Sequence, residues 1–176
     1  GVFLGLIVAL YTIAAMMGIQ LPYIYTVLLV LMLGVGFIDD VRDLSPYTKF
    51  SVQILAVLLF YFSCDMRIDN LHGIFGLYEI PMYISLPLTL IVCVGLINSI
   101  NLIDGIDGLS SGYSLMASLL FGAWAYMSGD KINLLISCSL IGALVPFFIY
   151  NVFGKKCKMF IGDAGTMVMA MLMTWF

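Results

Sequence analysis

Charged side chains are scarce in this sequence. Only 10% of its 176 residues are Asp, Glu, Lys or Arg, whereas a soluble globular domain contains about 25%. Hydrophobic residues make up 63%. A chain of this composition has too few polar groups to cover a water-exposed surface. The scarcity of charge therefore excludes an ordinary soluble domain and indicates an integral membrane protein.

Histidine and cysteine are also few. The single histidine, His72, falls in a predicted outer loop, and we assign it no role. Of the four cysteines, Cys93 and Cys138 lie within apolar runs, while Cys64 and Cys157 fall on opposite sides of the membrane in the topology below. The sequence thus indicates neither a disulfide framework nor a CxxC metal site.

Long apolar runs fill most of the chain. A helix needs about 20 mostly apolar residues to cross the hydrocarbon core of a bilayer. The predicted fold class is therefore all-α, a polytopic transmembrane helix bundle with six complete spans and one truncated span. We expect residues 1–176 to form a single integral membrane domain that is part of a longer chain. The complete spans are 1–19, 21–38, 50–64, 82–97, 109–127 and 132–150, and the truncated span is 164–176.

The predicted crossings bring three acidic segments to the same side of the membrane. Two spans separate the acidic residues near position 39 from those near position 104, and two more separate these from Asp163. An excess of Lys and Arg marks the cytoplasmic side. The acidic side is therefore predicted to be cytoplasmic, because it carries five basic residues against two. These are Arg42, Lys49, Lys155, Lys156 and Lys158, against Arg67 and Lys131.

The second acidic segment carries four polar side chains at intervals of three. Asn98, Asn101, Asp104 and Asp107 would share one broad face of a continuous helix. The glycines that follow the two aspartates can adopt a positive φ and unwind the end of that helix. Carboxylates beside a membrane segment are costly unless they hold a metal, a proton or a substrate. The pattern therefore predicts a functional site.

The other two acidic segments allow two interpretations each. Asp39 and Asp40 are adjacent at the end of a span, where they suit Mg²⁺ or simply form a solvated end of the helix. Asp163 lies between two glycines before an apolar run, where it could cap a helix or bind a metal. Lys49 is either an anchor at the membrane interface or a contact to phosphate.

Together, these three segments resemble a known family. Asp39-Asp40, the motif from Asn98 to Gly108, and Phe160-Ile161-Gly162-Asp163-Ala164-Gly165 are similar to the signatures of the polyprenyl-phosphate N-acetylhexosamine-1-phosphate transferases. That family includes undecaprenyl-phosphate N-acetylglucosamine-1-phosphate transferases and the phospho-N-acetylmuramoyl-pentapeptide transferase of peptidoglycan synthesis. The resemblance spans most of the chain, in order. Thr166 stands where the family usually has serine, and the family's early basic loop and later histidine-rich loop lie outside this sequence.

The resemblance implies a reaction, partners and a location. The reaction is transfer of a sugar 1-phosphate from a UDP-sugar to polyprenyl phosphate, with release of UMP and dependence on Mg²⁺ or, alternatively, Mn²⁺. The implied partners are the UDP-sugar, the polyprenyl phosphate and the lipid bilayer, with no nucleic acid, and a homodimer is left open. The implied location is the cytoplasmic face of a bacterial inner membrane.

The resemblance also implies roles for site residues, by position. Asp39 would deprotonate or orient the lipid phosphate with support from Asp40, while Phe160 would stack on uracil. The implied catalytic residues are Asp39, Asp40, Asp104 and Asp107, the metal ligands are Asp163 and Asn101, and the substrate-binding residues are Lys49, Asn98 and Phe160.

Three functional alternatives follow from the sequence. The basic run at 155–158 favours the branch of the family that initiates surface-polysaccharide synthesis, with pentapeptide transfer in peptidoglycan synthesis as the alternative donor chemistry. Intramembrane carboxylates also mark cation or proton pathways, so a transporter is the alternative of another class. A transporter predicts acids spread through the depth of the bilayer, whereas here they fall at the predicted span boundaries and loops.

Overall fold

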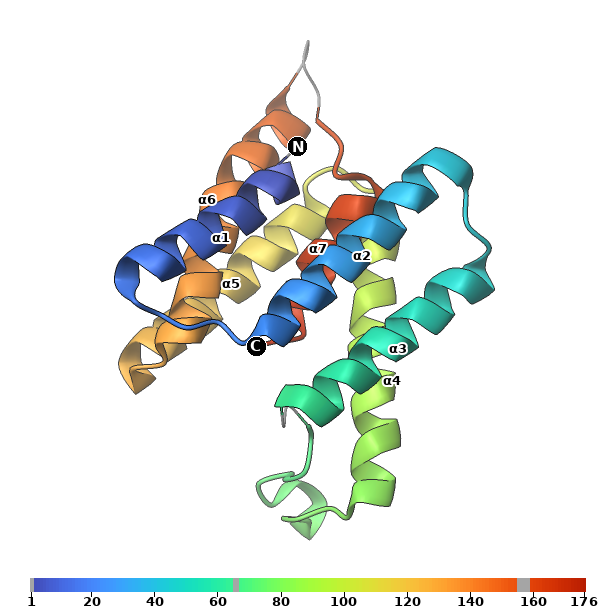
Figure 1. The fold of residues 1–176 in the computed structure, drawn as a ribbon, viewed down its shortest axis with the longest axis vertical. Helices are drawn as coiled ribbons and strands as arrows, with labels where there is room; N and C mark the ends of the chain where they lie inside the picture. The colour runs from blue at the N-terminus through green and yellow to red at the C-terminus, as the bar shows by residue number, and fades with distance from the viewer. Residues whose placement is uncertain (1, 65–66, 155–158) are drawn as a thin grey trace.

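A computed structural model describes residues 2–64, 67–154 and 159–176 of the chain (Figure 1). The basic run at 155–158, which supplies three of the five basic residues used to predict orientation, lies outside the described residues. Within them the chain is almost entirely helical, and extended segments pair only at a single antiparallel bridge between Asn70 and Glu79. The predicted all-α class is confirmed. The helices are α1 (Val2–Met17), α2 (Tyr23–Arg42), α3 (Pro46–Cys64), the short 3-10 helix η1 (Ile74–Gly76), α4 (Met82–Ile103), α5 (Leu109–Ser128), α6 (Lys131–Phe153) and α7 (Gly162–Met173).

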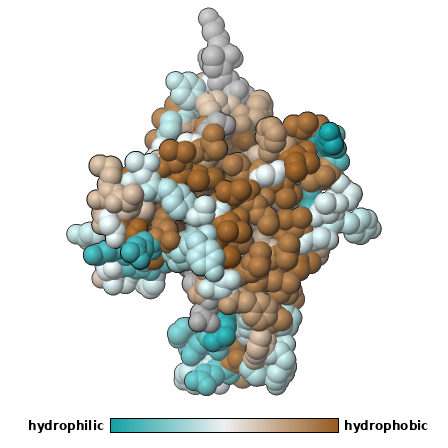
Figure 2. All heavy atoms as spheres, viewed as in Figure 1, coloured by the Kyte–Doolittle hydropathy of each residue, from teal (hydrophilic) through white to brown (hydrophobic). Residues whose placement is uncertain are grey.

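Four of these helices are long and apolar enough to cross a membrane, namely α2, α3, α4 and α6. Helix α1 is equally apolar in character but has 16 residues. Helix α5 has 20 residues and is less apolar, because its buried face includes serines at positions 110, 111, 114 and 118. Length and hydropathy therefore support four of the six complete spans that the sequence predicts. Hydrophobic side chains cover the middle of the face seen in Figure 2, and hydrophilic ones gather toward its edges.

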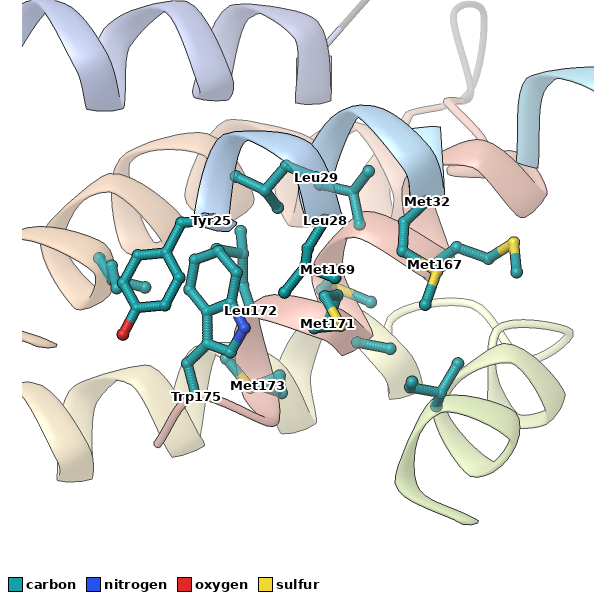
Figure 3. Close-up of a cluster of buried hydrophobic side chains, with 14 of the residues drawn as sticks. Tyr25, Leu28, Leu29, Met32, Met167, Met169, Met171, Leu172, Met173 and Trp175 are labelled. Carbon is teal, nitrogen blue, oxygen red and sulfur yellow. The ribbon is translucent and has the colours of Figure 1, made fainter. Parts of the chain in front are cut away.

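Helix α7 lies at the centre of the bundle, in contact with α1, α2, α4 and α5 (Figure 1). Every residue from Gly165 to Met173 is buried. A helix that is hydrophobic on all sides is stable only when other helices surround it. Leucines and Met32 of α2 pack against the methionines of α7, and Trp175 stacks on Tyr25 with the ring centroids 4.2 Å apart (Figure 3). This packing holds α7 in place and fixes where its first residues lie.

Helices α2 and α7 approach each other closely at Gly36. A Cβ atom added there would lie 2.4 Å from the Cα atom of Ala164. Only glycine therefore allows this approach without a shift of one backbone. The contact brings the end of α2, with Asp39 and Asp40, beside the start of α7, with Asp163.

Candidate functional site

The three predicted acidic segments meet at one end of the bundle. The end of α2 supplies Asp39 and Asp40, the end of α4 supplies Asn101, and the start of α7 supplies Asp163. Hydrogen bonds and ion pairs join these segments to one another and to Lys49 in the first turn of α3. The prediction that these segments lie together is confirmed, whereas the number of membrane crossings between them and the roles given to the residues stay predictions.

Asp39 is the buried carboxylate of the site, with 1% of the residue exposed. Its Oδ2 forms an ion pair with the Lys49 ammonium, and its Oδ1 accepts a hydrogen bond of 2.7 Å from the Leu44 amide. A buried carboxylate is stable only when it is paired and hydrogen-bonded. The turn from α2 into α3, which brings Lys49 back over the end of α2, therefore makes the burial of Asp39 tolerable.

Lys49 pairs with a second carboxylate. Its Nζ lies 3.4 Å from Oδ2 of Asp163. The side chains of Lys49 and Asp163 are 30% and 35% exposed, so both reach the solvent that Asp39 does not. One ammonium thus lies between carboxylates from α2 and α7. The arrangement leaves the three side chains with a net negative charge at the mouth of the site.

Asn101 fixes the orientation of Asp163. Its Nδ2 donates to Oδ1 of Asp163 and to Oγ1 of Thr166, both at 2.8 Å. The Thr166 hydroxyl in turn donates to the backbone carbonyl of Asp163 at 3.1 Å. Thr166 therefore supplies the hydroxyl at the position where the resemblance expects serine.

Asp40 contacts the backbone at the start of α7. Its carboxylate accepts hydrogen bonds from the Asp163 amide at 2.8 Å and the Ala164 amide at 3.3 Å. The residue before α7, Ile161, provides no side-chain cap. Asp40 thus caps α7 from another helix, in the place where a negative charge favours a helix N-terminus. This contact indicates that Asp40 positions Asp163.

The motif of four polar residues is divided by the end of α4. The helix ends at Ile103, so Asn98 and Asn101 lie on it, while Asp104 caps it and Asp107 lies exposed in the connection to α5. The connection turns at Gly108, whose φ is +74°, as the sequence allowed. The four residues therefore occupy one end of the bundle without sharing one helical face.

Asp104 lies in an unusual electrostatic environment. Burial raises the pKa of its carboxyl above the ordinary value, a hydrogen bond from Ser110 lowers it, and the nearby charge of Asp163 raises it, with a net upward direction. Ser110 is itself buried. The hydroxyl of Ser110 therefore opposes protonation of Asp104.

Ser110→Ala should move the acidic limb of the pH dependence of kcat/KM to higher pH. The substitution removes the hydrogen bond that favours the ionised carboxylate, so the pKa of Asp104 rises further, and a site that needs ionised Asp104 loses activity earlier as pH falls. The measurement is a pH–rate profile. Ser111→Ala is the control, since the buried Ser111 hydroxyl has no hydrogen-bond partner among the described residues. An unchanged acidic limb in Ser110→Ala would contradict a role for Asp104.

Asn98 belongs to an amide pair that the sequence did not reveal. Its Nδ2 donates to Oε1 of Gln53 at 2.7 Å and to the carbonyl of Val94 at 2.8 Å, while Gln53 Nε2 lies 3.4 Å from Asn98 Oδ1. Gln53 is buried in α3. A buried glutamine within an apolar span is a signal of such a partner. The pair joins α3 to α4 next to the site.

Two further residues complete the description of this end of the bundle. Asn151, in the last turn of α6, is buried, accepts a hydrogen bond from the Gly108 amide and donates one to the Met159 carbonyl, and the sequence offered no signal for it. Phe160 lies just before α7 with 74% of the residue exposed.

His72 lies in the connection from α3 to α4, at the other end of α3 from Lys49.

The oxygen atoms of the site suit a hard cation. In the described part of the chain, no three or more His, Cys, Asp or Glu side chains form a group that could hold a metal by themselves. Mg²⁺, however, commonly takes one or two protein carboxylates and completes its shell with water and substrate phosphates. Asp163, with Asn101 beside it, fits that requirement.

These observations define a class of protein: a helical membrane protein with paired carboxylates and one ammonium gathered where several helices end. Residues 22–176 match the glycosyl transferase family 4. The chain belongs to this family.

Curated relatives agree with the family. The chain is 35% identical over 148 residues to the phospho-N-acetylmuramoyl-pentapeptide-transferase of Streptococcus agalactiae, which covers 79% of this chain and 44% of the relative. It is 35% identical over 144 residues to the enzyme of the same name from Streptococcus pneumoniae, covering 77% and 43%. The chain thus spans less than half the length of these relatives.

Proposed function

We propose that this chain carries the site of a transferase that moves a sugar 1-phosphate, an N-acetylhexosamine 1-phosphate, from a UDP-sugar to polyprenyl phosphate and releases UMP. The observation that carries the proposal is the meeting of Asp39, Lys49 and Asp163 from three helices at one end of the bundle. Family membership supports the same reaction class.

The chemistry explains why such a site is needed. In the overall reaction, the bond from the sugar-bearing phosphorus to the bridging oxygen of UMP breaks, and a bond from that phosphorus to an oxygen of the polyprenyl phosphate forms. The reaction brings several negative charges together, so catalysis lies mainly in positioning and charge neutralisation. A bound Mg²⁺, or Mn²⁺, held by Asp163 and Asn101, would neutralise charge on the donor pyrophosphate.

The other site residues have roles that follow from their contacts. Asp39 orients the acceptor phosphate or accepts its proton, and Lys49 neutralises phosphate oxygens that approach the two carboxylates. Asp40 holds the start of α7 through its two amide contacts. Asp104 and Asp107 line the nucleotide side of the site, and Asn98 supports substrate binding from α4.

A groove beside the site suits the lipid acceptor. It has a volume of about 750 Å³, and every residue that lines it except one is either apolar or glycine. Asp40 is the exception, and it joins the groove to the carboxylate cluster. An isoprenoid chain could lie in such a groove with its phosphate at the polar end. The lining residues are Val2, Phe3, Leu4, Val30, Leu33, Gly34, Phe37, Asp40, Phe147, Met159, Phe160, Ile161, Ala164 and Gly165.

We place the site at the cytoplasmic face of a bacterial inner membrane. The family resemblance supports that face, because UDP-sugars are made inside the cell, and so does the five-to-two excess of basic residues. A transporter fits less well. The acidic side chains of the described residues all lie in terminal helical turns or in connections, whereas a conduction pathway needs them at several depths.

Two donors remain as candidates. The names of the relatives favour a UDP-linked N-acetylmuramoyl pentapeptide. The basic run before Phe160 favours a simpler UDP-N-acetylhexosamine of the branch that initiates surface-polysaccharide synthesis, such as O-antigen.

The test is an assay of UMP release by the full-length gene product that contains these 176 residues, purified in detergent with Mg²⁺. Both undecaprenyl phosphate and a UDP-sugar should be required, and the donor that gives the highest kcat/KM identifies the branch. UMP release that does not require the lipid acceptor would overturn the proposal. Failure of every UDP-sugar in the panel to yield UMP would overturn it as well.

Phe160→Ala should raise the KM for the UDP-sugar by about 5- to 150-fold. Stacking of a base on an aromatic ring contributes about 1–3 kcal/mol, which corresponds to this range. Phe160→Tyr retains a ring and should stay close to wild type. Phe62→Ala removes an exposed ring in the last turn of α3, at the end of this helix opposite to Lys49, and serves as the control. A donor KM unchanged in Phe160→Ala would show that Phe160 does not bind the base.

A further inference from the structure

The connection between α3 and α4 folds into a small hairpin, at the opposite end of these helices from the carboxylate cluster (Figure 1). Its two arms pair at the bridge between Asn70 and Glu79. The Ile68 amide donates to the buried Thr89 hydroxyl oxygen at 3.1 Å, which holds the start of the hairpin against α4. In the predicted topology this end lies on the outer side of the membrane. The hairpin is therefore anchored to the bundle far from the proposed transferase site.

A polar pocket lies between this hairpin and the ends of the two helices. It has a volume of about 430 Å³, which is enough for a small molecule. The Tyr61 hydroxyl of α3 donates to the Ser85 hydroxyl of α4 at 3.2 Å, and both residues are buried. The hairpin adds an amide and charged groups of both signs. The polar residues that line the pocket are Tyr61, Arg67, Asp69, Asn70, Glu79 and Ser85.

The charged groups of the pocket favour a ligand that carries both a negative and a positive group. Nε of Arg67 lies 3.2 Å from Oδ2 of Asp69. A guanidinium has several N–H donors, so this ion pair is compatible with a further hydrogen bond to a phosphate oxygen. Glu79 forms no ion pair with any other residue that the structure describes, and its carboxylate can accept hydrogen bonds from an ammonium group. One guanidinium with two carboxylates disfavours a ligand that is only anionic.

An apolar groove adjoins the pocket at the same arginine. Arg67 lines both the pocket and a groove of about 390 Å³ between α3, α4 and the end of α7. The other residues that line the groove are mainly apolar, among them Phe60 of α3, Val92 and Leu96 of α4, and Met173 of α7. A ligand with a polar head and a hydrocarbon tail fits this combination, because its head would lie in the pocket and its tail in the groove.

Exposed tyrosines indicate the depth of the pocket in the membrane. Tyr83 is 77% exposed in the first turn of α4, and Tyr78 is 66% exposed on the hairpin. Helix α4 is long and apolar enough to cross a membrane. Tyrosines at the end of such a helix typically lie at the level of the lipid head groups. The pocket is lined by Met82 and Ser85 from the same turn of α4, so it lies at that level as well. Figure 2 shows hydrophilic side chains at this end of the molecule.

We propose that this pocket binds the head group of a zwitterionic aminophospholipid of the outer leaflet, with its phosphate at Arg67, its ammonium at Glu79 and an acyl chain in the adjoining groove. Phosphatidylethanolamine has this chemistry, since its head group joins one phosphate to one primary ammonium. Phosphatidylglycerol has the phosphate without the ammonium. Phosphatidylcholine has a quaternary ammonium, which has no N–H group to donate to Glu79. The proposal concerns a second site and does not depend on the transferase reaction.

The test is native mass spectrometry of the full-length protein, delipidated in detergent and titrated with each of these three phospholipids carrying identical acyl chains. Wild type should bind phosphatidylethanolamine about fivefold more tightly than the other two, as expected for one additional ion pair near the surface. Glu79→Gln should abolish this preference, because glutamine keeps the shape of glutamate and removes its charge. Arg67→Gln should weaken the binding of all three lipids, because all three carry the phosphate.

Asp130→Asn and Lys131→Gln are the matched controls. Each removes one charge at the start of α6, on the same predicted side of the membrane, from a residue that does not line the pocket. Both variants should keep the wild-type preference. Equal binding of the three lipids by wild type would overturn the inference, and so would a preference that persists in Glu79→Gln. If Arg67→Gln fails to accumulate, Glu79→Gln still decides the question, since residue 79 is exposed. Lipid binding is measured without donor or acceptor, so its outcome is separate from that of the UMP-release assay.

Discussion

Asp163→Asn should reduce UMP release at least about 100-fold. Asparagine has nearly the same shape as aspartate, and its amide oxygen can still accept the hydrogen bond from Asn101. The substitution therefore removes one charge with little change of packing. Loss of a single preorganised electrostatic group at a reaction centre typically costs about 100- to 1000-fold in kcat. The measurement is the initial rate of UMP release at saturating donor and acceptor.

A second substitution and a control make this prediction specific. Asp39→Asn should reduce the rate to a similar extent, since it removes the buried charge that pairs with Lys49. Asp130→Asn should remain within about twofold of wild type, because Asp130 caps the far end of α6 and asparagine is an equally good N-cap. Normal rates in both Asp163→Asn and Asp39→Asn would show that the carboxylate cluster is not the reaction centre.

The fold and the gathering of the acidic segments could be predicted because they depend on features that the sequence carries directly. Apolar runs of helical length indicate membrane spans, and an even number of spans returns the chain to the same side. That count predicted that Asp39 and Asp163, which are 124 positions apart, lie on the same side of the membrane, and the family resemblance implied that they share one site. The structure joins them through Lys49.

The helix boundaries were harder to predict, since hydropathy reports apolar character and not helix geometry. Helix α3 begins at Pro46, four residues before the predicted span, and therefore includes Lys49 in its first turn. Helix α4 continues six residues beyond Ile97 and carries Asn98 and Asn101 on its end. Polar residues at helix ends are invisible to a method that looks for apolar runs.

The supporting contacts could not be predicted, because they depend on residues that are distant in sequence. Nothing local distinguishes Asp40, which caps α7, from Asp39, which pairs with Lys49. Asn151 resembles any polar residue at a membrane interface until its two partners are known. Such roles can be assigned only once the packing of α2, α6 and α7 against one another is known.

Gly36→Ala should lower both activity and stability, although residue 36 contacts no substrate. The added methyl group would lie 2.4 Å from the Cα atom of Ala164 and 2.8 Å from the carbonyl oxygen of Asp163. These are backbone atoms, which cannot move aside as a flexible side chain can. Overpacking of a core typically costs about 1–3 kcal/mol. We expect a loss near the upper end of this range, visible as a lower Tm in detergent.

The effect on activity follows from the direction in which the helices must separate. Gly36 lies one turn before Asp39 and Asp40, so moving α2 away from α7 separates these carboxylates from Asp163 and breaks the cap that Asp40 provides. A misplacement of about 1 Å at a reaction centre can cost about 100-fold in rate, and we expect a loss of UMP release of this size. Gly142→Ala is the matched control, because a Cβ atom there meets nothing within 4 Å, and alanine favours helix. If Gly36→Ala kept the wild-type rate and Tm, the close contact between α2 and α7 could not be what aligns the two halves of the site.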